Sequence, residues 1–269
     1  MTERIAESNY RQLHHFISHS KWEAESVMAA VGRKTADSLQ SLNGSTGLIL
    51  EESGHEKAGK KSVGVARQDI AQVGTVCNAQ VAVFAALVRA NRVGLVAGKL
   101  FLPKEWTDDV VRMSAAGIQK SEQHYQTKPE LAAELIEQLP AEVSDEWVGG
   151  ETIYGNSPLL RKKLKSLGKA FVLDVGEQLK VSLTDPEPFL PTVDGGSRGG
   201  RKPKPLVSGQ AGIELRQLGA EIGLREWQKI HYRNGTKERL VREAVLLPVF
   251  VWTGETAQVE QLQLIISRE

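Results

Sequence analysis

One segment, residues 79–88 (AQVAVFAALV), limits the possible folds more than any other part of the sequence. It is apolar throughout except for a single glutamine. An exposed strand alternates apolar and polar residues, whereas a nearly continuous apolar run is typical of a strand that is covered on both faces. We therefore expect residues 79–88 to form a central strand of a sheet.

Short apolar segments on either side of this run predict neighbouring strands. Leu48-Ile49-Leu50 is expected to form a buried strand that ends in a polar turn at residues 51–54 (EESG). Residues 62–67 (SVGVAR) alternate with period two, and residues 93–102 supply a further strand that Pro103 stops. Because the connections between these strands are short, they favour an antiparallel meander over parallel strands joined by helices.

Helical periodicity precedes the first strand, over residues 5–42. Ser20 followed by Glu23 is a capping-box pattern, which predicts that a second helix starts there. Asn43-Gly44 ends the helical region. Apolar residues recur every three or four positions and so share one face: Leu13, Phe16 and Ile17, then Val27, Ala30 and Val31.

Helices and strands alternate after Pro103. Residues 105–140 return to helical periodicity, and Lys128-Pro129-Glu130 marks a helix start because proline is favoured in the first turn. Residues 146–151 (EWVGGE) form a strand that ends on an acid. A basic helix at 158–167 and another buried strand at 170–175 (AFVLDV) complete this part.

The texture of the sequence changes after Val175. Residues 195–205 (GGSRGGRKPKP) are rich in glycine, proline and basic residues, which predicts a flexible loop. The later segments 227–232, 239–252 and 261–266 alternate as strands do. The sequence therefore divides into an N-terminal helical region (1–45), an α/β core with a mixed sheet (46–176) and a strand-rich region (177–269).

Composition and charge exclude several classes of protein. The chain has 34 Lys and Arg residues against 33 Asp and Glu residues, so its net charge of +1 gives no global argument for binding nucleic acid. No apolar run approaches the roughly 20 residues that span a bilayer, and the N-terminal segment lacks the apolar stretch of a secretory signal. Cys77 is the single cysteine and excludes an internal disulfide. We therefore expect a cytoplasmic protein without membrane contact.

Two acidic residues, Glu51 and Glu151, follow apolar strand cores and precede glycine-containing sequence. Burying a carboxylate at a strand end is costly unless it is paired or binds a metal ion. The two residues are therefore candidate ligands of a shared metal ion. The alternative is that both are exposed strand-end acids that accept hydrogen bonds from turn amides, and the pattern alone leaves both interpretations open.

Several whole segments resemble transposases of the DDE insertion-sequence group. These are residues 48–68 (LILEESGHEKAGKKSVGVARQ), 78–88 (NAQVAVFAALV), 99–109 (KLFLPKEWTDD), 127–132 (TKPELA) and 147–161 (WVGGETIYGNSPLLR). Residues 10–22 and 264–269 are similar to the same group, so the resemblance covers nearly the whole chain. It implies an α/β fold of the RNase H-like type, a mixed sheet flanked by helices with a strand-rich insertion.

The resemblance also implies a chemistry. In this family three carboxylates hold two divalent metal ions that hydrolyse DNA and then drive strand transfer, with Mg²⁺ or Mn²⁺ as the cofactor. The first family acid falls on Glu51 and the second on Glu151. Such metals stabilise the attacking and leaving oxygens, so water or a DNA 3′-hydroxyl attacks and no protein nucleophile is needed. The implied partner is double-stranded DNA at transposon ends, with a second copy of the chain or a full-length transposase as a further partner.

Two departures from the family pattern predict impaired cleavage. The family usually has Asp at both positions, and the extra methylene of each Glu moves its carboxylate by about 1.5 Å. The third family acid lies within a Tyr-x2-Arg-x3-Glu-x6-Lys pattern, and each tyrosine of this chain lacks an arginine three positions later. We therefore expect a C-terminally shortened transposase, with an inactive DNA-binding remnant or regulator of a full-length transposase as the alternative.

Three basic clusters are candidate contacts to DNA phosphates, because Lys and Arg supply most of the affinity for the DNA backbone. The first two would flank the metal site in an RNase H-like fold, whereas a solvated linker accounts for the third equally well. The candidates are Lys60, Lys61 and Arg67 after the first acid, Arg161, Lys162 and Lys163 after the second, and Arg201, Lys202 and Lys204 in the predicted loop.

Overall fold

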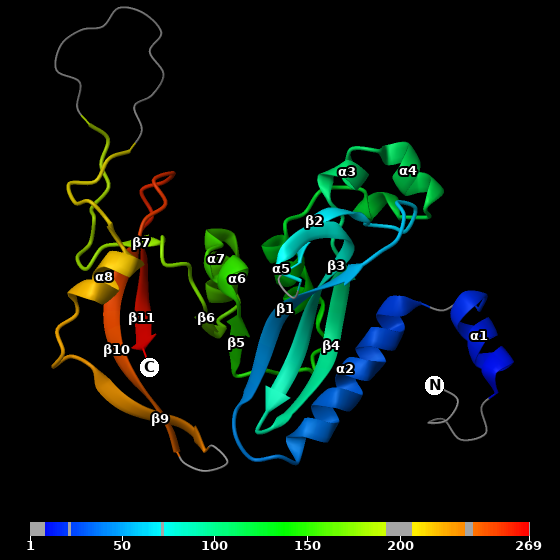
Figure 1. Ribbon diagram of the computed structural model, residues 1–269, viewed down its shortest axis with the longest axis horizontal. Coiled ribbons are helices and arrows are strands. Elements are labelled where there is room, and N and C mark those ends of the chain that lie inside the picture. Colours follow the sequence, from blue (N-terminus) through cyan, green and yellow to red (C-terminus); the bar gives the residue numbers. More distant parts are fainter. Residues whose placement is uncertain (1–8, 21–22, 71–72, 192–205, 235–238, 269) are drawn as a thin grey trace, which may run out of the picture. The chain divides into compact units, whose positions relative to one another are not determined.

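The computed structural model describes residues 9–20, 23–70, 73–191, 206–234 and 239–268. The chain forms two compact units, residues 1–174 and residues 175–269. The first is an α/β unit and the second is rich in strands (Figure 1). No helix within the described ranges combines the length and the apolar composition of a membrane span. The predicted loop at 195–205 lies outside the described residues.

The first unit is built on a six-stranded sheet. Its strands are β1 (Thr46–Glu56), β2 (Ala66–Ile70), β3 (Thr75–Arg89), β4 (Arg92–Leu100), β5 (Trp147–Gly150) and β6 (Ala170–Leu173). Its helices are α1 (Tyr10–Ser18), α2 (Ala24–Gln40), α3 (Lys104–Thr107), α4 (Val110–Ala115), the 3-10 turn η2 (Lys120–Glu122), α5 (Lys128–Gln138), α6 (Thr152–Gly155) and α7 (Pro158–Ser166).

The sheet mixes antiparallel and parallel pairing. The hydrogen-bonded order is β2-β3-β1-β5-β6. β4 also pairs with β3, along residues 82–89, whereas β2 pairs with residues 75–79 of β3. β1, β3 and β4 form an antiparallel meander, whereas β5 runs parallel to β1 and β6 runs parallel to β5. A three-stranded meander followed by two parallel strands confirms the predicted α/β mixed sheet of the RNase H-like type.

The predicted central strand is confirmed and is longer than its apolar run. Alternate residues of β3 from Ala79 to Leu87 are buried and the residues between them are half-buried, as expected for a strand with neighbours on both edges. Two other expectations were wrong. Residues 51–54 continue β1 because they pair with β3, so they form no turn. β6 is only partly buried, and its Val172 is 61% exposed because the strand lies at the edge of the described sheet.

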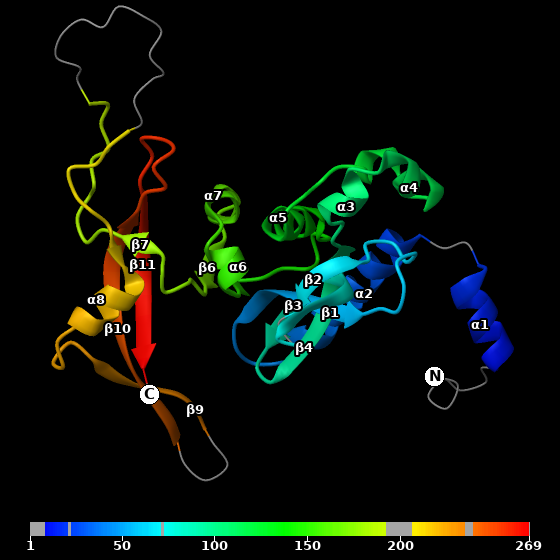
Figure 2. The ribbon, with the colours of Figure 1, turned by 45° about the horizontal axis from the view of Figure 1, so that its top comes forward.

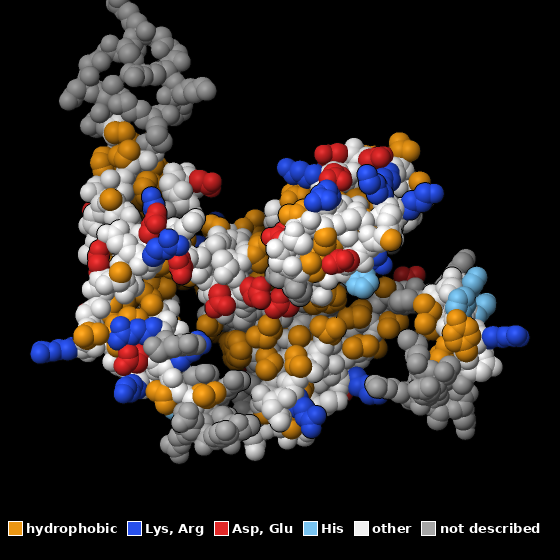
Figure 3. Space-filling model, viewed as in Figure 1, with side chains coloured by type: hydrophobic (Ala, Val, Ile, Leu, Met, Phe, Trp, Pro, Cys, Tyr) orange, Lys and Arg blue, Asp and Glu red, His pale blue; other side chains and the backbone are white. Residues whose placement is uncertain are grey.

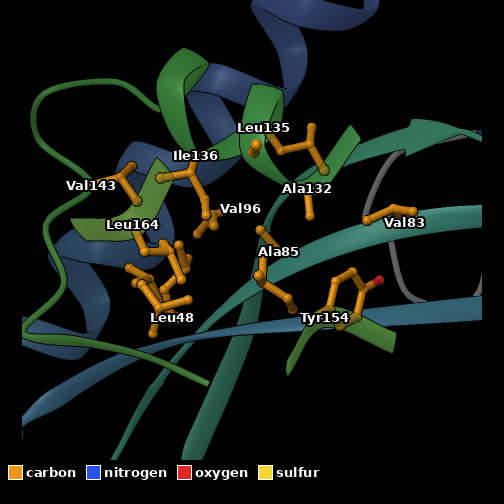
Figure 4. Close-up of a cluster of buried hydrophobic side chains, with 14 of the residues drawn as sticks. Leu48, Val83, Ala85, Val96, Ala132, Leu135, Ile136, Val143, Tyr154 and Leu164 are labelled. Carbon is orange, nitrogen blue, oxygen red and sulfur yellow. The ribbon is translucent and has the colours of Figure 1, made fainter. Parts of the chain in front are cut away.

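Four helices pack on one face of this sheet. α2, α5, α6 and α7 contribute side chains to the main core, where they meet Leu48, Leu50 and alternate residues of β3 (Figures 2 and 4). Because strand residues alternate between faces, Glu52 shares this face with Leu48 and Leu50, and Glu51 belongs to the other. On that other face the Trp147 ring lies across two glycines. A Cβ added at Gly47 would be 2.4 Å from its Cζ2 atom.

The predicted start of α2 was wrong, and the apolar face that the sequence indicated is not the buried one. The helix begins at Ala24 with Glu23 as its N-cap, and no side chain caps it, so Ser20 forms no capping box. The predicted face (Val27, Ala30, Val31) is exposed, and the buried residues are Gly32, Ala36 and Leu39. Small residues let the helix approach β4 closely, since a Cβ at Gly32 would lie 3.2 Å from the Val96 carbonyl oxygen. Periodicity identified the helix, and close packing selected the face.

Local capping explains the helices that follow the sheet strands. The predicted start of α5 is confirmed: Thr127 accepts a hydrogen bond from the backbone N–H of Glu130, and the Glu130 carboxylate accepts one from the Thr127 backbone. α7 starts with Ser157 as its N-cap and Pro158 in its first turn. Gly168 then adopts φ +66°, the left-handed conformation that favours glycine after a helix.

The second unit has its own small core. Its elements are β7 (Lys180–Val181), β8 (Ile213–Glu214), α8 (Leu215–Glu221), β9 (Gln228–Asn234), β10 (Arg239–Val251) and β11 (Glu260–Arg268). The three predicted strands form an antiparallel sheet of order β11-β10-β9, and the sequence pattern missed α8 and the short β7-β8 pair. Val181, Leu218 and Val249 are among the residues buried between these elements.

Candidate active site

Two neighbouring parallel strands bring Glu51 and Glu151 together. The register of β1 and β5 places Leu50 beside Gly150; Glu51 is the next residue of β1, and Glu151 directly follows the end of β5 as the N-cap residue of α6. Because parallel strands run in the same direction, residues one step beyond a paired position also lie side by side. Residues that are 100 positions apart in the sequence are therefore brought together by the register.

The electrostatics of Glu51 show that the two carboxylates are close. The pKa of Glu51 is raised, first by burial and then by the negative charge of Glu151 and a hydrogen bond shared with it. The backbone N–H of Glu52 donates to the Glu51 Oε1 atom at 3.1 Å and works in the opposite direction. Because the negative charge of Glu151 raises the pKa of Glu51, the two carboxylates repel each other when both are ionised. A divalent cation between them would remove that repulsion.

Glu151 keeps its side chain available. It is the N-cap residue of α6, yet its carboxylate makes no capping hydrogen bond, and the side chain is exposed. Only its backbone carbonyl serves the helix, as the acceptor for the Tyr154 N–H at 2.9 Å. The strand-to-helix turn therefore fixes the backbone of Glu151 and leaves the carboxylate at the surface of the first unit. Acidic side chains gather over the β1 and β5 region beside apolar surface (Figure 3).

Three residues near this pair were missed in the sequence. Glu52 forms an ion pair with Lys128, with 2.6 Å between the Glu52 Oε2 and Lys128 Nζ atoms, and both side chains are less than a fifth exposed. The charges of Glu52, Glu51 and Glu151 all act on the buried Tyr154 hydroxyl. The position of Glu52 directly after the first acid could have indicated a role in the site. Its partner Lys128 on α5 could not be predicted, because only the tertiary structure brings the two residues together.

The donor atoms fit a hard divalent cation. Mg²⁺ prefers oxygen ligands and is commonly held by one or two carboxylates, with water and substrate phosphate oxygens completing the shell. Glu51 and Glu151 supply such a pair on a rigid sheet. Within the described residues no group of three or more His, Cys, Asp or Glu side chains has a metal-binding arrangement. The described part of the chain therefore offers two acidic ligands.

The basic residues after the first acid are at the surface. Lys60 and Lys61 lie in the connection between β1 and β2, and Arg67 lies on β2; all three are exposed. The connection is pinned in place because the Arg112 guanidinium donates to the Lys60 carbonyl at 2.6 Å. The Arg67 guanidinium donates to the Val76 carbonyl at 3.0 Å. These side chains are accessible to a polyanion.

The basic residues after the second acid differ from one another. Arg161 is only 2% exposed, and its guanidinium donates to the carbonyl of Gly155, so it stabilises the connection of α6 and α7 and does not reach solvent as a phosphate contact would. Lys162 is exposed. Lys163 pairs with Glu137 at 2.5 Å. Arg201, Lys202 and Lys204 lie outside the described residues.

Comparison with known proteins identifies the family of the chain. The family model of the DDE superfamily endonucleases matches residues 1–239. A probable transposase for insertion sequence element IS701 from Microchaete diplosiphon is 33% identical over 132 residues, which is 49% of this chain and 31% of that protein. The match thus spans about a third of the length of the relative. With most of the chain matched by one family model, the chain belongs to the DDE superfamily endonucleases.

Proposed function

We propose that this chain is a DDE-type transposase polypeptide that cleaves DNA and transfers DNA strands with the help of divalent metal ions. The observation that carries the proposal is that Glu51 of β1 lies beside Glu151, which directly follows the parallel strand β5; the pKa of Glu51 is raised first by burial and then by Glu151. Family membership supplies the reaction class. The related protein is described as a transposase, which supports transposon DNA as the substrate.

Glu51 and Glu151 are the residues that would hold Mg²⁺ or Mn²⁺. Bound there, the metal would activate the attacking oxygen and stabilise the leaving oxygen of a phosphodiester. The protein itself would contribute the position of the two carboxylates, which depends on the register of β1 against β5 and on the buried residues of these strands. The pair of glutamates where the family has aspartates supports lowered activity, because reacting groups displaced by about 1 Å can cost on the order of 100-fold in rate.

Exposed basic side chains supply the proposed grip on the DNA backbone. Lys60, Lys61 and Arg67 follow the first acid, and Lys162 follows the second. Each phosphate that a Lys or Arg neutralises releases counterions, so binding should weaken steeply with salt. Lys163 would first have to leave Glu137, and Arg161 is not among the proposed contacts because it is buried. Arg201, Lys202 and Lys204 remain candidates from the sequence.

The direct test is metal-dependent nicking of supercoiled DNA by the purified chain. We expect nicking with Mg²⁺ or Mn²⁺, none with EDTA, and loss of nicking in Glu51→Gln and Glu151→Gln. The matched control is Glu142→Gln, which changes an exposed glutamate away from the site in the same way. Equal nicking by wild type and both site variants, all folded, would refute the assignment of these two residues.

A second candidate function is DNA binding without cleavage. The observation that favours it is the absence, within the described residues, of a third acidic ligand beside the pair. Salt-dependent binding in a gel-shift assay, together with no nicking at any metal concentration, would establish this alternative. Absence of both binding and nicking would reject both candidates. Raised nicking in a Glu51→Asp, Glu151→Asp double variant would show that the longer side chains limit the wild-type reaction.

A further inference from the structure

The positive charge of the chain is concentrated in one short segment of the second unit. Residues 225–242 (REWQKIHYRNGTKERLVR) contain six Lys and Arg residues against two Glu residues, a net charge of +4. The rest of the chain has 28 Lys and Arg residues against 31 Asp and Glu residues, so its net charge is −3. The total of +1 hides this difference, and the distribution of charge indicates a segment that attracts a polyanion.

This segment forms β9 and the first residues of β10, which pair as an antiparallel ribbon (Figure 1). β9 is an edge strand, because the order of its sheet is β11-β10-β9. Three consecutive residues of β9, Lys229, Ile230 and His231, are all exposed. Since consecutive residues of a strand point to opposite faces, neither face of β9 is covered by other described residues at these positions.

The paired residues of β10 are exposed as well. Arg242 lies opposite Ile230 on one face of the ribbon, and Val241 lies opposite His231 on the other. Ile230 is 47% exposed and Val241 is 49% exposed. The core of the second unit involves later residues of β10, such as Val249. Packing in this core therefore does not explain why the ribbon combines basic and apolar side chains on its surface.

The ribbon begins at a fixed point of the second unit. The Arg268 guanidinium of β11 donates to the Glu243 carboxylate of β10 at 2.7 Å. The same guanidinium lies 4.0 Å from the centre of the Trp227 ring, directly before β9. One side chain thus links β11, β10 and the start of β9. A ribbon that is held in this way loses less conformational entropy when it binds a partner.

Duplex DNA is a polyanion whose shape fits such a ribbon. The major groove of B-DNA is wide enough to admit two antiparallel strands. Lys and Arg side chains would meet phosphates, and exposed aliphatic side chains would meet apolar atoms in the groove, such as thymine methyl groups. Figure 3 shows Lys and Arg side chains beside hydrophobic ones over this part of the second unit.

We propose that the ribbon of β9 and the start of β10 binds the backbone of duplex DNA, with Lys229 and Arg242 as contacts to phosphates. The inference rests on the proposed function, which supplies DNA as the polyanion. It adds a contact in the second unit to the exposed basic residues that were proposed in the first. It requires neither a metal ion nor cleavage, because the contacts to phosphates act through charge.

The test is the binding of the full chain to a labelled DNA duplex, measured by fluorescence anisotropy in EDTA at several salt concentrations. The variant Lys229→Gln, Arg242→Gln removes two positive charges from the ribbon. Each phosphate contact on B-DNA contributes about 0.9 to the slope of log K against log salt concentration, so the slope should fall by about 1.8. The affinity at about 0.1 M salt should fall by about 60-fold, since the same slope acts over the decade between 0.1 M and 1 M. The loss should be equal on duplexes of unrelated sequence.

The matched control is Lys120→Gln, Lys180→Gln, which removes two exposed charges outside the ribbon and should bind as wild type does. Lys229→Arg, Arg242→Lys keeps both charges of the ribbon and should also bind as wild type does. Melting temperatures equal to that of wild type check that each variant is folded.

Wild-type affinity and slope in the Lys229→Gln, Arg242→Gln variant would overturn this inference and leave the proposed function standing. An equal loss in the control variant would also overturn it, because net charge would then set the affinity wherever the charge lies. A loss in the charge-preserving variant would reject the role of charge at the ribbon. Absence of DNA binding by the wild type would overturn both the inference and the proposed DNA substrate.

Discussion

Replacing Glu151 by glutamine should raise the melting temperature of the protein in the absence of metal. Once metal is present, the variant should melt at a lower temperature than wild type. The substitution keeps the size of the side chain and removes one of two neighbouring negative charges; the pKa of Glu51 is raised by burial and, after that, by the charge of Glu151. Two neighbouring carboxylates destabilise a protein when no cation lies between them, because they share one sign of charge. Stability and function should therefore respond in opposite directions.

The magnitude follows from the exposure of the two carboxylates. Two unit charges about 4 Å apart repel by about 1 kcal/mol in water and by about 4 kcal/mol at an effective dielectric constant of about 20. Glu151 is exposed and Glu51 is half-buried, so solvent screening favours the lower figure, about 1 kcal/mol. For a unit of 174 residues this corresponds to a rise of about 2–4 °C in melting temperature.

The assay is thermal denaturation of wild type and Glu151→Gln, in EDTA and in a Mn²⁺ series. In EDTA at low salt the variant should melt higher, and the difference should shrink at about 1 M salt, where charges are screened within about 3 Å. With Mn²⁺ at about 100 times its dissociation constant, wild type should gain about 2.7 kcal/mol and overtake the variant. A variant that melts below wild type in EDTA would refute the reasoning, since Glu151 would then have a stabilising partner.

Three further changes test the supporting structure. The pKa of Glu134 is lowered, because burial raises it less than the hydrogen bonds from Lys99, Gln126 and Gln138 and the charge of Lys99 lower it. The Glu134 carboxylate should therefore stabilise the fold by about 1–3 kcal/mol above the unfolded pKa of 4.5, and this stabilisation should be lost as the pH falls through the lower folded pKa. Urea denaturation at several pH values should show that Glu134→Gln removes it. Lys128→Met should cost about 2–4 kcal/mol because it removes the cation that pairs with the largely buried Glu52 carboxylate, and adding Glu52→Gln should restore part of that loss in the same assay. Gly47→Ala should lower the melting temperature, by about 1–3 kcal/mol of stability, because the new methyl group overlaps the Trp147 ring.

Each of these changes has its own contrary result. Glu134→Gln with the same stability loss at pH 4 and pH 7 would show that the charge of Glu134 contributes nothing. Additive losses for the Lys128 and Glu52 variants would show that the ion pair is not coupled. Gly209→Ala is the control for Gly47→Ala, since a Cβ there meets no atom within 4 Å; equal losses at both positions would rule out the overlap with Trp147.

Some elements followed from the sequence because their causes are local. Thr127 and Glu130 cap α5 with their own side chains, so four consecutive residues suffice to predict the helix start. The apolar run at 79–88 predicted a central strand for a similar reason, since few other structures bury every side chain of such a run. The same applies to β5 and to Glu151, which directly follows it in the chain.

Other features depended on residues far away in the sequence. Glu51 was expected at the end of a strand, and β1 continues because β3 is long enough to pair with it up to Glu56. Arg161 was predicted to contact DNA phosphates, yet its buried guanidinium donates to the carbonyl of Gly155 at the end of α6. A helical sequence shows where charges are, and it does not show which of them face a neighbouring element.

By itself the sequence determined the two acids, their positions after apolar segments and the class of fold that such an order permits. Only the tertiary structure decided that these acids are neighbours, because the register of β1 against β5 is set by how Leu48, Leu50 and Val148 fit beneath the helices. A slip of one residue would turn one carboxylate to the opposite face of the sheet. The packing of apolar side chains on the helix-covered face of the sheet therefore determines which carboxylates lie side by side on its other face.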